Sequence, residues 1–316
     1  MTNKIKSPIG GLSFDTLKND LPAGLVVFLV ALPLCLGIAL ASGAPLFSGL
    51  ITGVIGGMIV SMASGSQLAV SGPAAGLTII VLTAITDIGS YPGFLVAVVL
   101  AGILQLVLGF VKAGTIGNYF PSSVIKGMLA AIGIILIIKQ IPHAIGYDVD
   151  YEGDFQFDQP DHENSFSALI SAVNKMSIGA LIISGVSTLI LVYWNKIKVK
   201  QLQLIPAPLI VVLLGIGLNI LFDNAFPDIS LHDNHLVNLP VAASANEFIS
   251  FFTFPDFTFL KQGIIYKVAL TLAIVASIET LLSIEAVDKL DTHRRNTPPN
   301  RELKAQGVGN IVAGLI

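Results

Sequence analysis

The stretch GSQLAVSGPAAG, residues 65–76, decides the fold, because it interrupts a chain that otherwise consists of long apolar runs. Its first seven residues show no helical pattern, and glycine and proline then stand directly before an apolar run that ends near residue 86. Proline is favoured at the first position of a helix, so we expect a helix of about fifteen residues that begins near Pro73. Such a helix covers about 22 Å, which is too short to cross a bilayer alone. The stretch therefore predicts a half-helix whose N-terminus lies inside the membrane.

The rest of the chain indicates an all-α polytopic membrane protein. Apolar residues make up 53% of the sequence and charged residues 12%, about half the charged fraction of soluble domains. We expect residues 1–20 to form a cytoplasmic segment and residues 21–316 a transmembrane domain. The expected apolar spans are 21–41, 47–63, 72–86, 92–111, 123–141, 177–195, 203–222 and 266–286, and a ninth begins within 304–316.

The basic residues predict one orientation. With the N-terminus in the cytoplasm, all but four of the 17 Lys and Arg residues lie on the inner side, as the positive-inside rule requires. The two long loops expected outside, 142–176 and 223–265, are acidic. This distribution predicts a multi-pass protein of a bacterial-type plasma membrane.

The half-helix is the first candidate binding site. Non-helical backbone at membrane depth survives only where it is packed in protein or lines a wet cavity, and broken helices mark transport sites. The backbone N–H groups of Ala74, Ala75 and Gly76, together with the helix dipole, favour an anion. The alternative is a kinked or re-entrant helix that is packed for structural reasons alone.

Glu279 is the second candidate, because a carboxylate inside an apolar span is costly and is by default functional. Ser283 lies four residues further on and so on the same helical face. The pair offers two oxygen ligands for Na⁺, or the carboxylate carries a coupling proton. The alternative is a structural glutamate bonded to another helix, and Glu285 and Asp288 are expected to be solvated.

Other functions find little support in the sequence. The acidic loop that includes Asp148 lacks the spacing of a calcium-binding loop, and His232 and His235 have no cysteine nearby for a zinc site. No nucleotide-binding motif and no catalytic set of residues is present, so we expect no enzyme activity, no nucleic-acid partner and no cofactor apart from Na⁺ as a coupling ion.

Several motifs resemble the sulfate permease (SulP) family of anion transporters. They are LPLCLG at 32–37, VSGP at 70–73, SIETLLS at 277–283, NREL at 300–303, and AQG at 305–307 followed by Asn310. The resemblance covers nearly the whole chain. It departs from the family in one loop, where residues 295–299 replace the His-Asn-Ser that usually precedes NREL.

The resemblance implies fourteen membrane segments in two inverted repeats of seven, with a core domain, a gate domain and two half-helices around the anion. The second half-helix and a cytoplasmic STAS domain are then expected beyond residue 316, and the protein is expected to be a homodimer. Carried over by position, the anion pocket falls at Leu34, Ile38, Ala74, Ala75 and Glu279. Its candidate substrate-binding residues are completed by Ser71 and Gly76, and Glu279 with Ser283 takes the place of an Asp–Thr pair of cation-coupled bicarbonate members.

The sequence therefore predicts a secondary active carrier of a small oxyanion, sulfate or bicarbonate before dicarboxylate, coupled to Na⁺ or H⁺ and working by alternating access. Within transport, a nucleobase carrier of the same design is the alternative, although a half-helix of alanine and glycine offers no side chain to a ring edge. An anion channel and a non-transporting scaffold are the alternatives from other classes.

Overall fold

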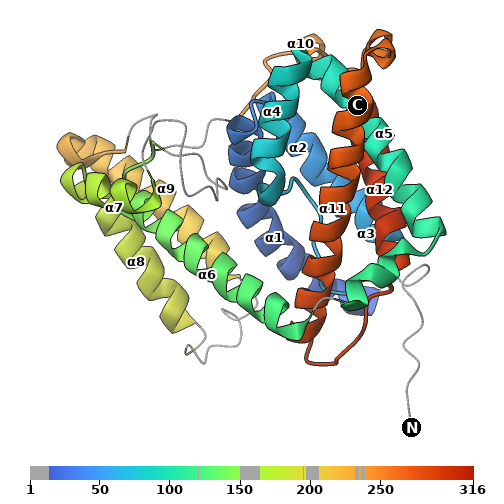
Figure 1. Cartoon of the computed structure of the whole chain (residues 1–316). Coiled ribbons are helices and arrows are strands. Elements are labelled where there is room, and N and C mark those ends of the chain that lie inside the picture. The colour runs from blue at the N-terminus through green and yellow to red at the C-terminus, as the bar shows by residue number, and fades with distance from the viewer. Residues whose placement is uncertain are drawn as a thin grey trace. The chain divides into compact units, whose positions relative to one another are not determined.

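The computed structural model describes residues 14–119, 121–149, 164–194, 196, 206–231, 235 and 239–316, and every regular element in these residues is a helix (Figure 1). The chain divides into two compact units. Of the described residues, the larger unit holds those within 34–133 and 239–316, and the smaller unit holds those within 14–33, 134–149 and 164–235. Helices α1 and α6 contribute to both units.

The elements follow the expected spans closely. In chain order the helices of the larger unit, with α1 and α6 that it shares, are α1 (Phe14–Ala41), α2 (Leu46–Ile55), the π-helical turn η1 (Gly56–Val60), α3 (Ser61–Ala63), η2 (Ala75–Leu77), α4 (Thr78–Ile88), α5 (Tyr91–Phe110), η3 (Ala113–Tyr119), α6 (Ser122–Ala144), α10 (Ala245–Ser250), η7 (Phe257–Lys261), α11 (Gly263–Leu290) and α12 (Pro299–Leu315). The smaller unit adds α7 (Ser165–Asn174), α8 (Ile178–Trp194), α9 (Ala207–Ala225) and η5 (Pro227–Ile229).

Five of the described helices are long and apolar enough to cross a membrane, and the bent pair α7–α8 makes a sixth span if it is counted as one. The two helices of that pair meet at 112°, and α7 lies in a segment that the sequence predicted to be an outer loop. On α9 only 6% of the apolar window is buried in the protein. Its apolar side chains therefore face outward, as expected for a helix surrounded by lipid.

Helices α5, α11 and α12 pack together in the larger unit (Figure 1). The contact between α5 and α12 runs through glycines: a Cβ added at Gly102 would lie 2.7 Å from the carbonyl oxygen of Gly307. The converse distance, from a Cβ at Gly307 to the Gly102 oxygen, is 2.8 Å. Further along, a Cβ at Gly314 would lie 3.0 Å from the Leu95 oxygen. The two backbones therefore touch, which is the packing that small residues permit in membrane helices.

Local capping signals position α4 and α5. Helix α4 ends at Gly89, whose φ of +70° suits glycine, and the Ser90 side chain accepts a hydrogen bond of 3.2 Å from the Gly93 N–H. Proline at the second residue of α5 costs no hydrogen bond there, because the first N–H groups of a helix have no partner within it.

Loops that the sequence assigns to the outer side meet one another in the larger unit. The Phe47 ring contacts the Phe248 ring edge-on at 5.4 Å between centroids. The Asp256 N–H donates to the Pro92 carbonyl at 3.1 Å. Both contacts join segments that the alternation of spans predicts to be on the same side.

Loops assigned to the inner side also meet one another. The Gly114 N–H donates to Asn300 Oδ1 at 2.9 Å, and Arg301 Nε donates to the Ala63 carbonyl at 2.9 Å. In this unit, segments predicted to lie on the same side of the membrane therefore contact each other, on the outer side and on the inner side alike. Which end faces the cytoplasm stays a prediction.

Candidate functional site

The half-helix begins two residues later than the sequence predicted. Residues 64–74 are non-helical, the 3₁₀ turn η2 begins at Ala75, and α4 follows directly. The expectation that Pro73 opens the helix is wrong, because Ala74 is still extended, with φ −97° and ψ 114°. The Leu77 N–H bonds to the Ala74 carbonyl at 3.1 Å and closes the first turn. The helix N-terminus therefore lies at Ala75 and Gly76, inside the candidate motif.

The Glu279 side chain lies against this N-terminus. The carboxyl group lies against the Gly76 backbone. A Cβ added at Gly76 would lie 2.9 Å from Glu279 Oε1 and 3.4 Å from Oε2, so the two residues are in contact. The expectation that the Gly76 N–H serves a bound anion stays a prediction. The protein's own carboxyl group occupies the positive end of the half-helix.

Ser71, at the end of the extended segment, is already engaged by a neighbouring helix. Its hydroxyl donates to Gln306 Oε1 of α12 at 3.1 Å. The π-helical turn η1 packs on the other side of this residue, because a Cβ at Gly56 would collide with the Ser71 carbonyl. A π turn within a span is common next to functional sites.

The remaining candidate residues lie on α1 and α11. Ile38 is buried on α1 and Leu34 is half-buried, and this part of α1 packs on α2, where a Cβ at Gly53 would lie 2.8 Å from Cys35 Sγ. Ser283 is exposed on α11, one turn beyond Glu279. The roles assigned to Leu34, Ile38 and Ser283 stay predictions.

A buried polar layer between α5, α11 and α12 was missed in the sequence. Gln105 on α5 is fully buried, accepts from Asn310 Nδ2 of α12 at 2.6 Å, and donates to Ser277 Oγ of α11 at 3.5 Å. Ser277 stands two residues before Glu279. A glutamine within an apolar run was the available signal, since such residues usually bond to another helix.

The loop that departs from the family pattern is held by two aspartates at the end of α11. Asp288 accepts from the Thr297 N–H at 2.6 Å and from its hydroxyl at 2.7 Å, so the expectation of a merely solvated Asp288 is wrong. Asp291 pairs with Arg295 at 2.7 Å. The side-chain hydrogen bond from Arg295 is the main reason that the pKa of Asp291 lies well below its usual range.

In the smaller unit, Asp148 joins two segments expected on the outer side. Its two carboxyl oxygens bond to His143 Nδ1 at 2.6 Å and to His235 Nδ1 at 2.7 Å. Asp148 is therefore not a solvated loop residue as expected. Burial alone would raise its pKa, but the hydrogen bonds and charges of the two histidines outweigh burial and lower the pKa. Among the described residues no group of three or more His, Cys, Asp and Glu is arranged to hold a metal ion, and His232 lies outside them.

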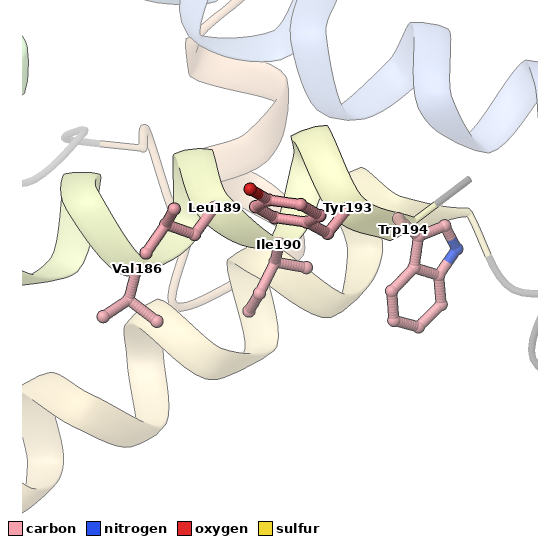
Figure 2. Close-up of a pocket in the computed structure, with 5 residues that line it drawn as sticks. All are labelled: Val186, Leu189, Ile190, Tyr193 and Trp194. Atoms are coloured by element: carbon pink, nitrogen blue, oxygen red, sulfur yellow. The ribbon is translucent and has the colours of Figure 1, made fainter. Parts of the chain in front are cut away.

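An apolar groove of about 300 Å³ follows one face of α8 (Figure 2). Its lining residues recur at helical spacing and none is charged: Val186, Leu189, Ile190, Tyr193 and Trp194. The Lys196 ammonium lies 4.6 Å from the centroid of the Tyr193 ring, but the lining residues themselves offer an anion no charged side chain. Tyrosine and tryptophan at the end of a span are typical of the membrane interface, so the groove suits lipid contact rather than transport.

Comparison with known proteins places this arrangement in context. The sequence profile of the sulfate permease family matches residues 17–316. The protein YvdB of Bacillus subtilis (strain 168) is 27% identical over 307 residues, which cover 96% of this chain and 54% of YvdB. The bicarbonate transporter BicA of Picosynechococcus is 26% identical over 323 residues, covering 100% of this chain and 52% of BicA. The chain thus spans about half the length of these curated relatives.

The fold is also known from a solved structure. The transmembrane domain of a cyanobacterium bicarbonate transporter BicA matches with a TM-score of 0.59 at 24% identity, covering 96% of this chain and 73% of that domain. At this identity the match shows a shared fold. It confirms the predicted inverted-repeat transporter fold with a discontinuous helix.

Proposed function

Because this chain belongs to the sulfate permease family, we propose that it carries a small inorganic oxyanion, sulfate or bicarbonate, across the membrane. The family description names sulfate, and BicA, which is 26% identical, is a bicarbonate transporter. Both anions present tetrahedral or planar oxygens with one or two negative charges, so one type of site suits both. Transport, rather than catalysis, is the function that the family membership supports.

The observation that carries the proposal is the carboxyl group of Glu279 at the N-terminus of the half-helix. A carboxylate is itself a small oxyanion, so this end of the helix already accommodates the chemistry of the proposed substrate. The helix dipole and the first N–H groups favour such a ligand. Ala74, Ala75 and Gly76 add no polar side chain, which disfavours the recognition of a nucleobase edge.

The same contact supports coupling to a cation. A second anion about 4 Å from an ionised Glu279 would be repelled by about 4 kcal/mol at an effective dielectric constant of about 20. A proton on Glu279, or a Na⁺ bound between Glu279 and Ser283, would remove that repulsion. We therefore propose that cation and anion bind together, and that the carrier then alternates access by movement of a core domain against a gate domain.

We also propose where the transporter resides and how it assembles. The distribution of Lys and Arg supports a plasma membrane with the N-terminus in the cytoplasm. A homodimer is proposed from the family resemblance alone.

The test is uptake into proteoliposomes that contain the full-length protein. Labelled sulfate and bicarbonate are compared, each with and without a Na⁺ gradient or a pH gradient, and uracil serves as the nucleobase control. Saturable uptake with counterflow of one anion is expected. Flux that follows voltage without saturation would indicate a channel, and no flux would indicate a scaffold.

A single variant links the uptake to the half-helix. Ala75→Asp places a second carboxylate at the helix N-terminus, where it would repel the anion. Uptake of the transported anion is expected to be lost while the amount of folded protein is retained. Unchanged affinity in Ala75→Asp would place the anion site elsewhere.

A further inference from the structure

The extended segment that leads into the half-helix is held at both ends by a single helix, α12. At its start, the Ser64 hydroxyl donates to Glu302 Oε2 at 2.5 Å. At its end, the Ser71 hydroxyl donates to Gln306 Oε1 at 3.1 Å. Glu302 and Gln306 are one helical turn apart and bond to each other, Gln306 Nε2 donating to Glu302 Oε1 at 3.4 Å. The four side chains form one continuous chain of hydrogen bonds, which we call the α12 clamp.

The direction of the hydrogen bonds in the α12 clamp is set by Glu302. This side chain is 2% exposed, and its two oxygens accept from the Ser64 hydroxyl and from the Gln306 NH₂ group. Because the NH₂ group of the Gln306 amide donates to Glu302, the amide oxygen is the atom that faces Ser71 and accepts from its hydroxyl. Burial of the carboxylate is tolerated because both oxygens are satisfied.

The two ends of the extended segment have further support. Next to Ser64, the Ala63 carbonyl accepts from Arg301 Nε at 2.9 Å, so two successive contacts link the end of α3 to the first turn of α12. Next to Ser71, the backbone is pressed against Gly56 of η1. Between these anchors Val70 is 62% exposed. The segment is thus fixed at its ends by α12 and not by burial of its middle.

We propose that Glu302 and Gln306 are positioning residues for the anion site. By fixing Ser64 and Ser71 along α12, they set where Ala75 and Gly76 meet Glu279, although neither residue touches that contact. Gln306 has the more direct effect, since Ser71 lies only five residues before Gly76. This inference rests on the proposed function, because the position it controls is that of the proposed anion site.

The first experiment separates positioning from general stability by kinetics. Proteoliposomes with the full-length protein are assayed for the KM and the maximal rate of sulfate and bicarbonate uptake. Gln306→Leu and Ser71→Ala each remove the same hydrogen bond. Each is expected to raise KM about tenfold, the effect of one hydrogen bond of ordinary strength, with a change of less than about twofold in maximal rate.

The double variant Ser71→Ala/Gln306→Leu is the decisive comparison. Because Ser71→Ala removes a contact that Gln306→Leu has already removed, the KM of the double variant is expected to equal that of Gln306→Leu. Lys304→Met is the matched control on the same helix, since Lys304 lies over the Phe110 ring and takes no part in the α12 clamp. Additive effects in the double variant, or KM values unchanged in both single variants, overturn the proposal.

A second readout does not depend on the transported solute. A cysteine in place of Val70 reports access to the middle of the segment through its rate of maleimide labelling, and Cys35 is buried. Labelling is expected to be several-fold faster when Gln306→Leu is added, and unchanged with Lys304→Met. If the wild type carries neither anion, the proposed function fails, and equal labelling rates in wild type and Gln306→Leu would separately show that the α12 clamp does not hold the segment.

Discussion

Glu279 combines two properties that single residues of a membrane span seldom share: it carries an ionisable group and contacts the N-terminus of another helix. The carboxyl group lies where an anion is favoured by the half-helix dipole. A solute anion at the same place must therefore share these amides with Glu279 or displace it. The protonation or cation binding of one residue thereby decides whether the site accepts a second negative charge.

We predict that Glu279→Gln abolishes the dependence of uptake on the Na⁺ or pH gradient, while exchange of anion for anion persists. Glutamine keeps the size of the side chain and an acceptor oxygen beside Gly76, but it carries no charge for a cation to neutralise. The measurement is uptake with and without each gradient. Ser283→Ala should weaken the dependence only if the cation is Na⁺. Unchanged gradient dependence in Glu279→Gln would make this carboxylate structural.

A second prediction concerns Gly76. In Gly76→Ala the new Cβ would approach Glu279 Oε1 to 2.9 Å, so the carboxylate must shift away from the helix N-terminus. The added methyl group also fills space at the helix N-terminus that a solute anion would need to approach the backbone, so anion affinity is expected to fall by about tenfold. Gly72→Ala is the matched control, because a Cβ there meets nothing within 4 Å. The measurement is the concentration of anion that protects against thermal unfolding. Equal affinities in the two variants would count against the site.

At this scale the sequence predicted the chemical groups but not their partners. Glu279 stood out because a carboxylate within an apolar span is rare, and Gly76 because glycine followed the proline. Their contact joins residues from distant parts of the chain, and no local pattern reports such a meeting. The same holds for Gln306. It belongs to a motif noted in the sequence, but its contact with Ser71 follows only from the fold.

Among the elements, the apolar spans were predicted to within a few residues, because hydrophobic length alone defines them. The start of the half-helix was displaced because Ala74 stays extended after Pro73, a choice that depends on the packing of the preceding segment. Helix α7 was missed, since its ten residues are too few for a span and follow an acidic loop. Short helices that rely on tertiary contacts give weak sequence signals.

A third prediction concerns the contact between the end of α6 and the segment of His235. In Asp148→Asn two charge-assisted hydrogen bonds become neutral, which costs about 1 kcal/mol each and should lower Tm by a few degrees at neutral pH. The pKa of Asp148 is lowered in the folded state, so its contribution is complete above the ordinary value near 3.9 and is lost as pH falls through the folded value.

Thermal unfolding from pH 8 to pH 3 provides the measurement. The gap in Tm between wild type and Asp148→Asn is expected to narrow as the pH falls below the ordinary value, because the wild-type carboxyl then becomes protonated. Asp223→Asn is the control, because this exposed carboxylate ends α9 away from Asp148 and its two histidines. A gap that does not narrow toward acid pH, or no gap at neutral pH, would contradict the role of the Asp148 carboxylate.

For the molecule as a whole, we predict that the ends of α11 lie on opposite sides of the membrane. The helix has 28 residues, or about 42 Å, and links a loop expected outside to one expected inside. A cysteine replacing Asn246 should label from outside intact cells, and one replacing Thr292 should not. Both positions are exposed, and Cys35 is buried. The opposite labelling pattern would invert the topology.

The glycine contacts between α5 and α12 have a mechanical consequence. With carbonyl oxygens about 2.8 Å from the space where a side chain would begin, no compressible layer separates the two backbones. Helices in such contact resist sliding along each other, because sliding would bring the peptide groups of the two backbones into collision. A displacement of α5 must then reach the segment from Ser64 to Ser71 undiminished, through α12. If α5 and α12 move during transport, the half-helix is therefore expected to move together with them as one rigid group.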